Sequence, residues 1–168
     1  MGIKLEGKPV AQAISEQLKH RIKMLAEKNI IPALLIIRVG MRQDDISYEK
    51  GILKKCDELG IKAVVKLLSG DVPQEELIKV IKSANENSGI HGIMLFRPLP
   101  DHIDTNAVRN VIDPVKDVDC MSPLNLAKVF EGKADGIVPC TPRAVIEMLR
   151  YYNIPLEGAN VVVVGRSL

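Results

Sequence analysis

A repeated alternation between helical and strand-like segments is the feature of this sequence that most constrains its fold. Residues 7–28 carry apolar side chains at the spacing of one helical face, namely Val10, Ile14, Leu18, Ile22 and Leu25. The apolar run at 32–39 then ends at Gly40, which is typical of a strand covered on both faces. An amphipathic helix is therefore expected to lead into a buried strand.

The same cycle recurs twice along the chain. We expect a helix over about 47–59 that ends at Gly60, followed by a strand over 61–68. A further helix and strand are expected at 73–88 and 90–96. Strands that alternate with helices of this length predict an α/β fold in which a parallel sheet lies between two layers of helices.

The chain changes character between residues 98 and 142, where six of its ten prolines lie among turn-forming Asp and Asn residues. We expect a functional loop region here, with only a short helix near 105–111. Helical periodicity resumes at 144–152, and the run at 160–165 is typical of a buried strand that reaches a glycine turn. A dinucleotide-binding unit begins in this way, although the rest of such a unit does not follow.

The composition excludes several classes of protein. Lys and Arg exceed Asp and Glu by only two and are scattered along the chain, so we expect no nucleic-acid partner. No apolar run approaches the roughly 18 residues that span a bilayer, and the first residues do not form a signal peptide. A soluble, globular, cytoplasmic protein without a membrane partner is expected.

The cysteines and histidines do not form a recognisable site. Cys56, Cys120 and Cys140 are widely spaced and lack any Cys-x-x-Cys pair, which argues against a disulfide framework and against a zinc site. The three histidines share no metal-ligand spacing. We therefore expect reduced thiols that serve mainly in packing, and no bound metal.

Four segments in a fixed order carry a resemblance to a known family. Any one of them is weak support, because short motifs recur by chance, but four in order are hard to obtain by coincidence. They are residues 5–11, residues 39–48 with Gly60 after them, residues 98–119, and residues 139–142 leading to 164–167. The chain resembles the amino-terminal portion of the methylenetetrahydrofolate dehydrogenase/methenyltetrahydrofolate cyclohydrolase family, of the FolD type.

The resemblance implies a folate-binding catalytic domain at 1–140. It implies that 141–168 hold the linking helix and first strand of an incomplete, Rossmann-like NAD(P)-binding domain. The implied reaction is NAD(P)-dependent oxidation of 5,10-methylenetetrahydrofolate to 5,10-methenyltetrahydrofolate, with hydrolysis to 10-formyltetrahydrofolate as a second activity. The implied substrate is a tetrahydrofolate derivative, the implied cofactor is NADP with NAD as the alternative, and the implied full-length assembly is a homodimer.

The resemblance also implies site residues. Tyr48 falls on the family's active-site tyrosine, and Asp119 on the carboxylate that binds the pterin; without the resemblance they would be an ordinary half-buried tyrosine and a turn aspartate. Pro98 and Leu99 are implied to contact the substrate. A positive charge after the glycine turn suits the 2′-phosphate of NADP. The implied cofactor-binding residues are Thr141, Gly165, Arg166 and Ser167.

Two linked positions depart from the family pattern. Ile52 stands one helical turn after the tyrosine, where the family has its general acid/base lysine, and Phe96 replaces the glutamine that hydrogen-bonds that lysine. An isoleucine cannot transfer a proton, so the hydrolytic activity is expected to be weak, lost or rebuilt on other residues. Arg97 either brings a new positive charge into the cleft or is a solvated strand-end residue. Cys120 stands where the family usually has glycine, which can alter the local turn.

Three functions are compatible with this sequence to different degrees. A dehydrogenase is favoured, because hydride transfer depends least on the missing lysine. The alternative is a folate-binding or regulatory homologue without catalysis. A generic sugar- or nucleotide-binding α/β domain explains the periodicity but not the four ordered segments. The 168-residue chain alone is expected to be inactive as a dehydrogenase, because its nucleotide-binding part is incomplete.

Overall fold

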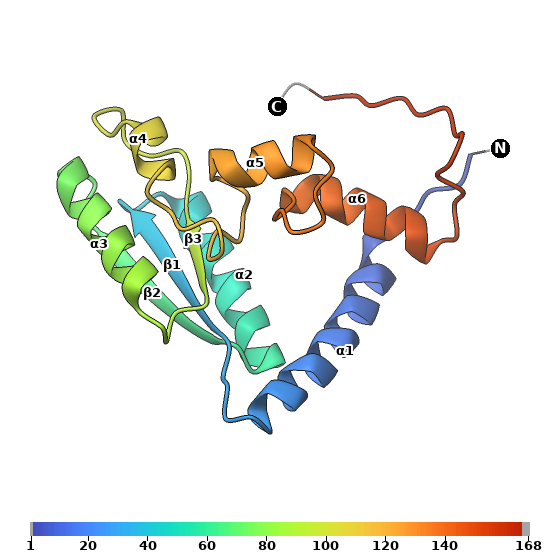
Figure 1. The fold of residues 1–168 in the computed structure, drawn as a ribbon, viewed down its shortest axis with the longest axis horizontal. Helices are drawn as coiled ribbons and strands as arrows, with labels where there is room; N and C mark the ends of the chain where they lie inside the picture. The colour runs from blue at the N-terminus through green and yellow to red at the C-terminus, as the bar shows by residue number, and fades with distance from the viewer. Residues whose placement is uncertain (1, 166–168) are drawn as a thin grey trace.

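The computed structural model describes residues 2–165, and it contains one parallel sheet of three strands in the order β2-β1-β3 (Figure 1). The strands are β1 (Ala33–Val39), β2 (Lys62–Leu68) and β3 (Gly92–Leu95). Ile93 also forms an isolated parallel bridge with Asp117, which ties the later loop to the outer edge of β3. The parallel sheet predicted from the alternation is confirmed.

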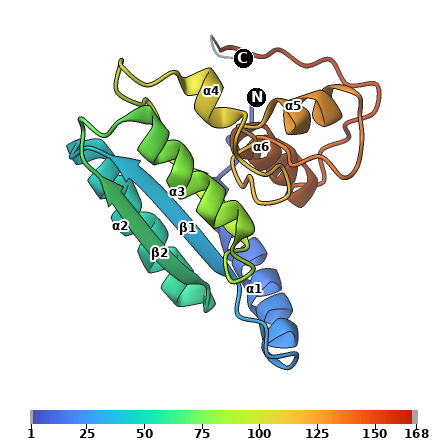
Figure 2. The same ribbon diagram turned by 60° about the vertical axis from the view of Figure 1, so that its left-hand side comes forward.

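Helices cover both faces of this sheet. Figure 2 shows α3 (Gln74–Glu86) in front of the strands and α2 (Gln43–Leu59) behind them. The remaining helices are α1 (Gly7–Ala26), α4 (Thr105–Arg109), α5 (Pro123–Phe130) and α6 (Cys140–Tyr151). The three-layer α/β architecture is therefore confirmed. Within residues 2–165, no helix combines the length and the apolar character that crossing a membrane requires.

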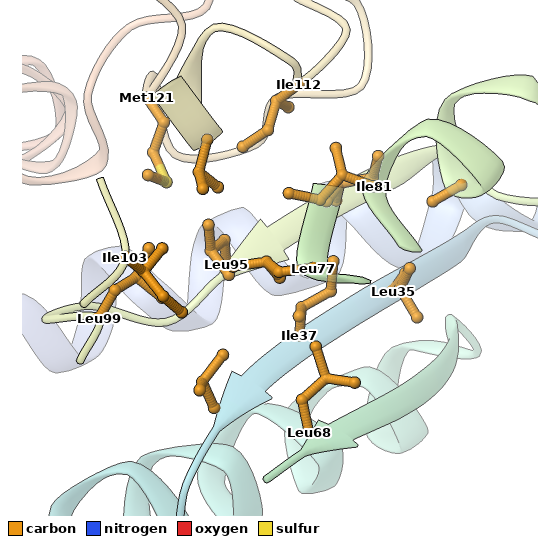
Figure 3. Close-up of a cluster of buried hydrophobic side chains, with 14 of the residues drawn as sticks. Leu35, Ile37, Leu68, Leu77, Ile81, Leu95, Leu99, Ile103, Ile112 and Met121 are labelled. Atoms are coloured by element: carbon orange, nitrogen blue, oxygen red, sulfur yellow. The ribbon is translucent and has the colours of Figure 1, made fainter. Parts of the chain in front are cut away.

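The central strand β1 is buried on both faces, and its side chains alternate between two layers. Ile37 belongs to the main core beside α3, whereas Arg38 faces α2 and pairs there with Glu49. In Figure 3, Leu77 and Ile81 of α3 lie on the same side of the sheet as Ile37. All three of these apolar side chains are 0% exposed. Burial from both sides explains why this strand is an almost continuous apolar run in the sequence.

The first and last helices lie against each other at the edge of the molecule away from the sheet (Figure 1). Tyr152, directly after α6, fixes the chain just before α1. Its Oη accepts a hydrogen bond from the backbone N–H of Glu6 at 3.2 Å and donates one to the carbonyl oxygen of Glu6 at 3.0 Å. Residues near the two ends of the described chain are thereby joined.

The loop after β3 is attached to the carboxyl end of α3. Lys116 Nζ donates hydrogen bonds to the backbone oxygens of Ala84, Asn85 and Asn87 at 2.9, 2.7 and 2.7 Å. The last carbonyls of a helix lack partners within the helix, and a cation there also suits the helix dipole. The Asn85 side chain also binds the loop, since its Oδ1 accepts a hydrogen bond from the backbone N–H of Asp113 at 3.1 Å. This loop is therefore held in one place.

The predicted strand at 160–165 was wrong. These residues have no regular secondary structure, and Val162, Val163 and Val164 are 89%, 87% and 96% exposed. A strand needs a neighbour that satisfies its backbone hydrogen-bonding groups. In the described part of the chain no strand pairs with these residues, so their high strand propensity has no sheet to join.

Two helices begin earlier than predicted. α2 begins at Gln43 instead of residue 47, so Tyr48 lies in the second turn and not at the helix start. α6 begins at Cys140 instead of residue 144, because Pro142 is tolerated in a first turn, where its missing N–H has no helical partner to lose.

The helix α5 was not predicted, because the prolines around it suggested a loop. Ser122 is its N-cap and accepts a hydrogen bond on its hydroxyl oxygen from the backbone N–H of Leu124 at 3.3 Å. Pro123 occupies the first helical position, which proline favours. A serine followed by a proline is a signal for the start of a helix, but the other prolines nearby made this segment resemble a loop.

The variant Lys116→Met tests the attachment of the loop to α3. It removes three charge-assisted hydrogen bonds, and we expect the free energy of unfolding to fall by about 2 kcal/mol in urea denaturation followed by circular dichroism. The control is Lys133→Met, whose side chain is 59% exposed in a surface ion pair with Glu131. Its effect should stay below about 0.5 kcal/mol. Equal losses in the two variants would contradict the role given to Lys116.

Candidate functional site

An open hollow of about 150 Å³ lies at the carboxyl end of β3. We call it the β3 hollow. The carboxyl ends of parallel strands are where open α/β sheets bind ligands, because the loops that follow the strands gather there. It is therefore the candidate site. Its lining residues are Asp45, Tyr48, Met94, Leu95, Phe96, Arg97 and Asp119.

Two aromatic rings form the apolar part of the hollow. The rings of Tyr48, on α2, and Phe96, directly after β3, have centroids 5.4 Å apart and are tilted by 38°. Tyr48 is 60% exposed, whereas Phe96 is only 7% exposed. Phe96 is thus fixed by packing, and the accessible face of Tyr48 can stack on a flat ring.

An ion pair forms the polar part of the hollow. Arg97 Nη2 lies 3.6 Å from Asp119 Oδ2, and the two side chains are 52% and 34% exposed. An ion pair this accessible contributes little to folding stability. Both groups can therefore meet a ligand, the guanidinium as a hydrogen-bond donor and the carboxylate as an acceptor.

The buried carboxylate of Asp117 shapes the loop that carries Asp119. Its Oδ1 accepts hydrogen bonds from the backbone N–H groups of Asp119 and Met121 at 3.3 and 3.0 Å. Its Oδ2 accepts from the backbone N–H of Ser122 at 2.8 Å and from Asn125 Nδ2 at 3.0 Å. Asp117 is 1% exposed. Sequence reasoning placed this residue within a motif but did not recognise it as the centre of the turn.

Cys120 completes this turn in a conformation that glycine favours. Its φ of +54° lies in the left-handed region, which costs a non-glycine residue about 1–2 kcal/mol. The hydrogen bonds to Asp117 on either side hold the backbone there. The cysteine therefore occupies a position suited to glycine, with its side chain buried.

Cys140 joins the start of α6 to the same loop. Its Sγ donates a hydrogen bond to the carbonyl oxygen of Val118 at 3.6 Å. Partial burial raises the pKa of this thiol, and the nearby carboxylate of Asp119 raises it further. Burial also raises the pKa of the Cys56 and Cys120 thiols. All three cysteines are free.

A second ion pair supports the helix that carries Tyr48. Arg38 Nε lies 2.7 Å from Glu49 Oε2, and Arg38 Nη1 donates to the carbonyl oxygen of Gly40 at 2.7 Å. The side chains of the two charged partners are 6% and 12% exposed, and a charge this buried must be paired with an opposite charge to be tolerated. This pair fixes the second turn of α2 to the end of β1. Sequence reasoning missed it, because the partners lie on different elements.

The structure brings together part of the predicted substrate site. Tyr48, Phe96 and Asp119 line the β3 hollow. Ile52 is half-buried on α2 and is not one of the lining residues. Leu99 is 8% exposed within the main core (Figure 3), and Pro98 before it is exposed outside the hollow. Substrate contact by these last two residues stays a prediction.

Two of the four predicted cofactor residues, Thr141 and Gly165, lie within the described chain, and cofactor contact by them stays a prediction. Thr141 is exposed in the first turn of α6. Gly165 lies in the exposed segment without regular secondary structure. Arg166 and Ser167 lie outside the described residues. For residues 2–165, there is no cluster of three or more His, Cys, Asp or Glu side chains that could hold a metal ion.

The variant Asp117→Ala tests the turn around Asp119. It leaves two buried and one partly buried backbone N–H groups without an acceptor, and we expect the free energy of unfolding to fall by about 3 kcal/mol or more in urea denaturation. The control is Asp135→Ala, because Asp135 pairs with Lys128 on the surface and its side chain is 70% exposed. Its urea midpoint should stay close to that of the unchanged chain. A urea midpoint of Asp117→Ala close to that of the unchanged chain would refute the role of Asp117 in holding this turn.

The thiol of Cys140 should report on the charge of Asp119. A raised pKa means less thiolate at pH 7.5, so iodoacetamide should alkylate Cys140 more slowly than it does in the unfolded chain. Replacing Asp119 by Asn removes the negative charge, lowers the pKa and should accelerate the reaction, as measured by mass spectrometry of the Cys140 peptide. Asp101→Asn, at an exposed position, serves as the control. An unchanged rate in Asp119→Asn would show that the two groups do not interact.

Two sequence families match the chain. Residues 5–119 match the family described as Tetrahydrofolate dehydrogenase/cyclohydrolase, catalytic domain. Residues 139–168 match Tetrahydrofolate dehydrogenase/cyclohydrolase, NAD(P)-binding domain.

Individual relatives agree with these matches. The Bifunctional protein FolD of Clostridium kluyveri is 51% identical over 168 residues, which are 100% of this chain and 59% of that protein. FolD of Clostridioides difficile is 49% identical over 98% of this chain and 57% of its own length. The chain thus spans somewhat more than half the length of these relatives.

Solved structures show the same fold. FolD from Campylobacter jejuni superimposes with a TM-score of 0.94 at 37% identity, over 97% of this chain and 58% of that one. The Trypanosoma brucei enzyme, complexed with NADP cofactor and inhibitor, gives a TM-score of 0.84 at 33% identity, over 90% of this chain and 52% of that one. The chain belongs to the tetrahydrofolate dehydrogenase/cyclohydrolase family, of which it spans the catalytic domain and the start of the NAD(P)-binding domain.

Proposed function

We propose that this chain is the folate-binding part of an NAD(P)-dependent methylenetetrahydrofolate dehydrogenase whose cyclohydrolase activity is weak or lost. The observation that carries the proposal is the β3 hollow, in which an accessible tyrosine ring lies beside a carboxylate. Tyr48 stacks on the flat pterin ring, and Asp119 accepts hydrogen bonds from its amino-pyrimidine edge. We propose that Pro98 and Leu99 border the bound substrate.

The composition of the hollow suits hydride transfer. In that reaction the cofactor carries the chemistry, and the protein must hold the methylene carbon of the substrate in place. Fixed side chains serve this purpose, and Phe96 is fixed by its burial against Tyr48. The buried Arg38–Glu49 pair holds the turn of α2 from which Tyr48 projects.

The same composition is poorly suited to hydrolysis of the methenyl form. Adding water to the methenyl carbon needs a group that accepts a proton in the transition state. No lysine lines the described hollow, and Phe96 replaces the glutamine that the family resemblance implies. An arginine guanidinium donates hydrogen bonds but does not act as a base, so Arg97 cannot replace the lost lysine.

The nicotinamide cofactor would accept the hydride when it is bound, and we propose NADP with NAD as the alternative. Two features of the described chain fit such a group. Thr141 is exposed in the first turn of α6, on the helix whose first residue contacts the loop of Asp119. Gly165 has no side chain, and no other atom lies within 4 Å of the place where a Cβ would be, so a cofactor can approach the backbone closely. The residues proposed to hold it are Thr141, Gly165, Arg166 and Ser167.

The proposal extends to the organisation of the full-length protein. We place the boundary between the folate-binding domain and the NAD(P)-binding domain at residue 140, where α6 begins. We propose a homodimer as its assembly. A folate-binding or regulatory homologue without catalysis remains the second candidate, and the absence of a lysine or glutamine from the described hollow is the observation that favours it.

Assays that measure the two activities separately test this function. The full-length protein should reduce NADP with methylenetetrahydrofolate, whereas the 168-residue chain alone should not. Hydrolysis of methenyltetrahydrofolate should be about 100-fold slower in the unchanged protein than in the double variant Ile52→Lys with Phe96→Gln, because the variant regains a proton-transfer group. Both reactions are followed by absorbance.

The control is Ile31→Lys, which adds the same charge at a position that is 63% exposed and lies outside the hollow. It should leave hydrolysis unchanged. Equal hydrolysis by the unchanged protein and the double variant would refute the loss of cyclohydrolase activity. A full-length protein that binds folate but reduces no cofactor would favour the regulatory homologue.

A further inference from the structure

We propose that Arg97 is a substrate-recognition residue, whose guanidinium donates a hydrogen bond to the ring oxo group of the pterin while Asp119 accepts from the adjacent N–H groups. This inference rests on the proposed function. It makes Arg97 a second recognition residue of the hollow, beside Asp119. The sequence alone left open whether Arg97 is a cleft residue or a solvated strand-end residue.

The position of Arg97 makes it available to a ligand. It follows Phe96 directly at the end of β3 and lines the β3 hollow, and its side chain is 52% exposed. Its Nη2 lies 3.6 Å from Asp119 Oδ2, which exceeds the 2.7–2.9 Å of a close charge-assisted hydrogen bond. The two groups lie side by side at the hollow, and their exposed parts remain able to bond a ligand.

The remaining donors of the guanidinium are also unused. A guanidinium carries five N–H donors in a planar fork. Among residues 2–165, Asp119 is the ion-pair partner of the Arg97 side chain, at 3.6 Å, and no closer hydrogen bond to another protein group engages the guanidinium. By contrast, the donors of Arg38 are engaged by Glu49 and Gly40.

The order of donor and acceptor in the hollow matches one edge of a pterin. A 2-amino-4-oxo-pyrimidine presents an oxo acceptor, then a ring N–H donor, then an amino donor. A guanidinium beside a carboxylate presents the complementary order. If the oxo group were replaced by an amino group, a donor would face a donor, and the site would lose a hydrogen bond while burying an unpaired group.

A purely structural role does not account for Arg97. The pair with Asp119 is largely accessible, and such pairs contribute little to folding. A second pair on the same molecule provides a comparison, since Arg150 Nη1 lies 3.5 Å from Glu147 Oε1 with side chains 64% and 33% exposed. The two pairs are alike in geometry and exposure, but only that of Arg97 lies at the hollow.

Calorimetric titration of the 168-residue chain tests the proposal. The two ligands are folic acid and its 4-amino counterpart, in which the oxo acceptor becomes an amino donor and ring N3 loses its hydrogen. Arg97→Met should weaken binding of folic acid about 10-fold and should reduce the preference for the oxo form, of which the part due to Asp119 and the ring N–H remains. Arg97→Lys, which keeps a donor cation, should retain most of that preference. Arg150→Met should bind both ligands as the unchanged chain does.

Each outcome has a defined meaning. If Arg97→Met keeps the affinity for folic acid and the preference for the oxo form, Arg97 does not recognise the ring, while the proposed function stands. If both ligands are weakened equally, the role of Arg97 is not recognition of the oxo group, and the inference also fails. If the unchanged chain binds no folate up to millimolar concentration, the proposed function fails and the inference fails with it. Urea midpoints of all variants, which should be alike, show that each is folded.

Discussion

Burial of β1 on both of its faces is the constraint on which the rest of the structure depends. Its side chains alternate between a core shared with α3, which includes Ile37, and a layer shared with α2, which includes Arg38. A strand covered in this way requires cover on both faces of the sheet, and β1 also has parallel neighbours at both edges. The charged Arg38 is tolerated in that layer because Glu49 and the carbonyl oxygen of Gly40 satisfy it. The same ion pair fixes α2 beside the carboxyl end of the sheet, where the hollow opens.

The loops that form the hollow are held by buried polar groups. Asp117 binds three backbone N–H groups around Asp119, and Lys116 binds three carbonyl oxygens at the end of α3. These adjacent residues of opposite charge thus hold the loop on two sides. The rigidity that they provide lets exposed groups such as Arg97 and Asp119 stay in place without being needed for folding themselves. A site of this kind can change its chemistry while its fold is kept.

Periodic segments were predictable from the sequence, and isolated contacts were not. The three strands and the helices between them follow from local apolar patterns, and Gly60 ends α2 with a φ of +76° as its position suggested. Tyr48, Phe96 and Asp119 of the hollow were identified through ordered motifs, whereas Asp45 was not. The hydrogen bonds of Asp117 and the pair of Arg38 with Glu49 were missed, because their partners are separated in the sequence or belong to the backbone. The helix α5 was missed because prolines near a helix start resemble those of a loop.

The sequence by itself determined the layer architecture and the family, because apolar periodicity and ordered motifs are local properties of the chain. Only the tertiary structure decided which side chains share the β3 hollow, since Tyr48 comes from α2, Phe96 and Arg97 follow β3 directly, and Asp119 comes from the later loop. It also decided that the apolar run at 160–165 is not a strand in the described chain. Strand propensity is local, but a strand exists only where a neighbouring backbone completes its hydrogen bonds.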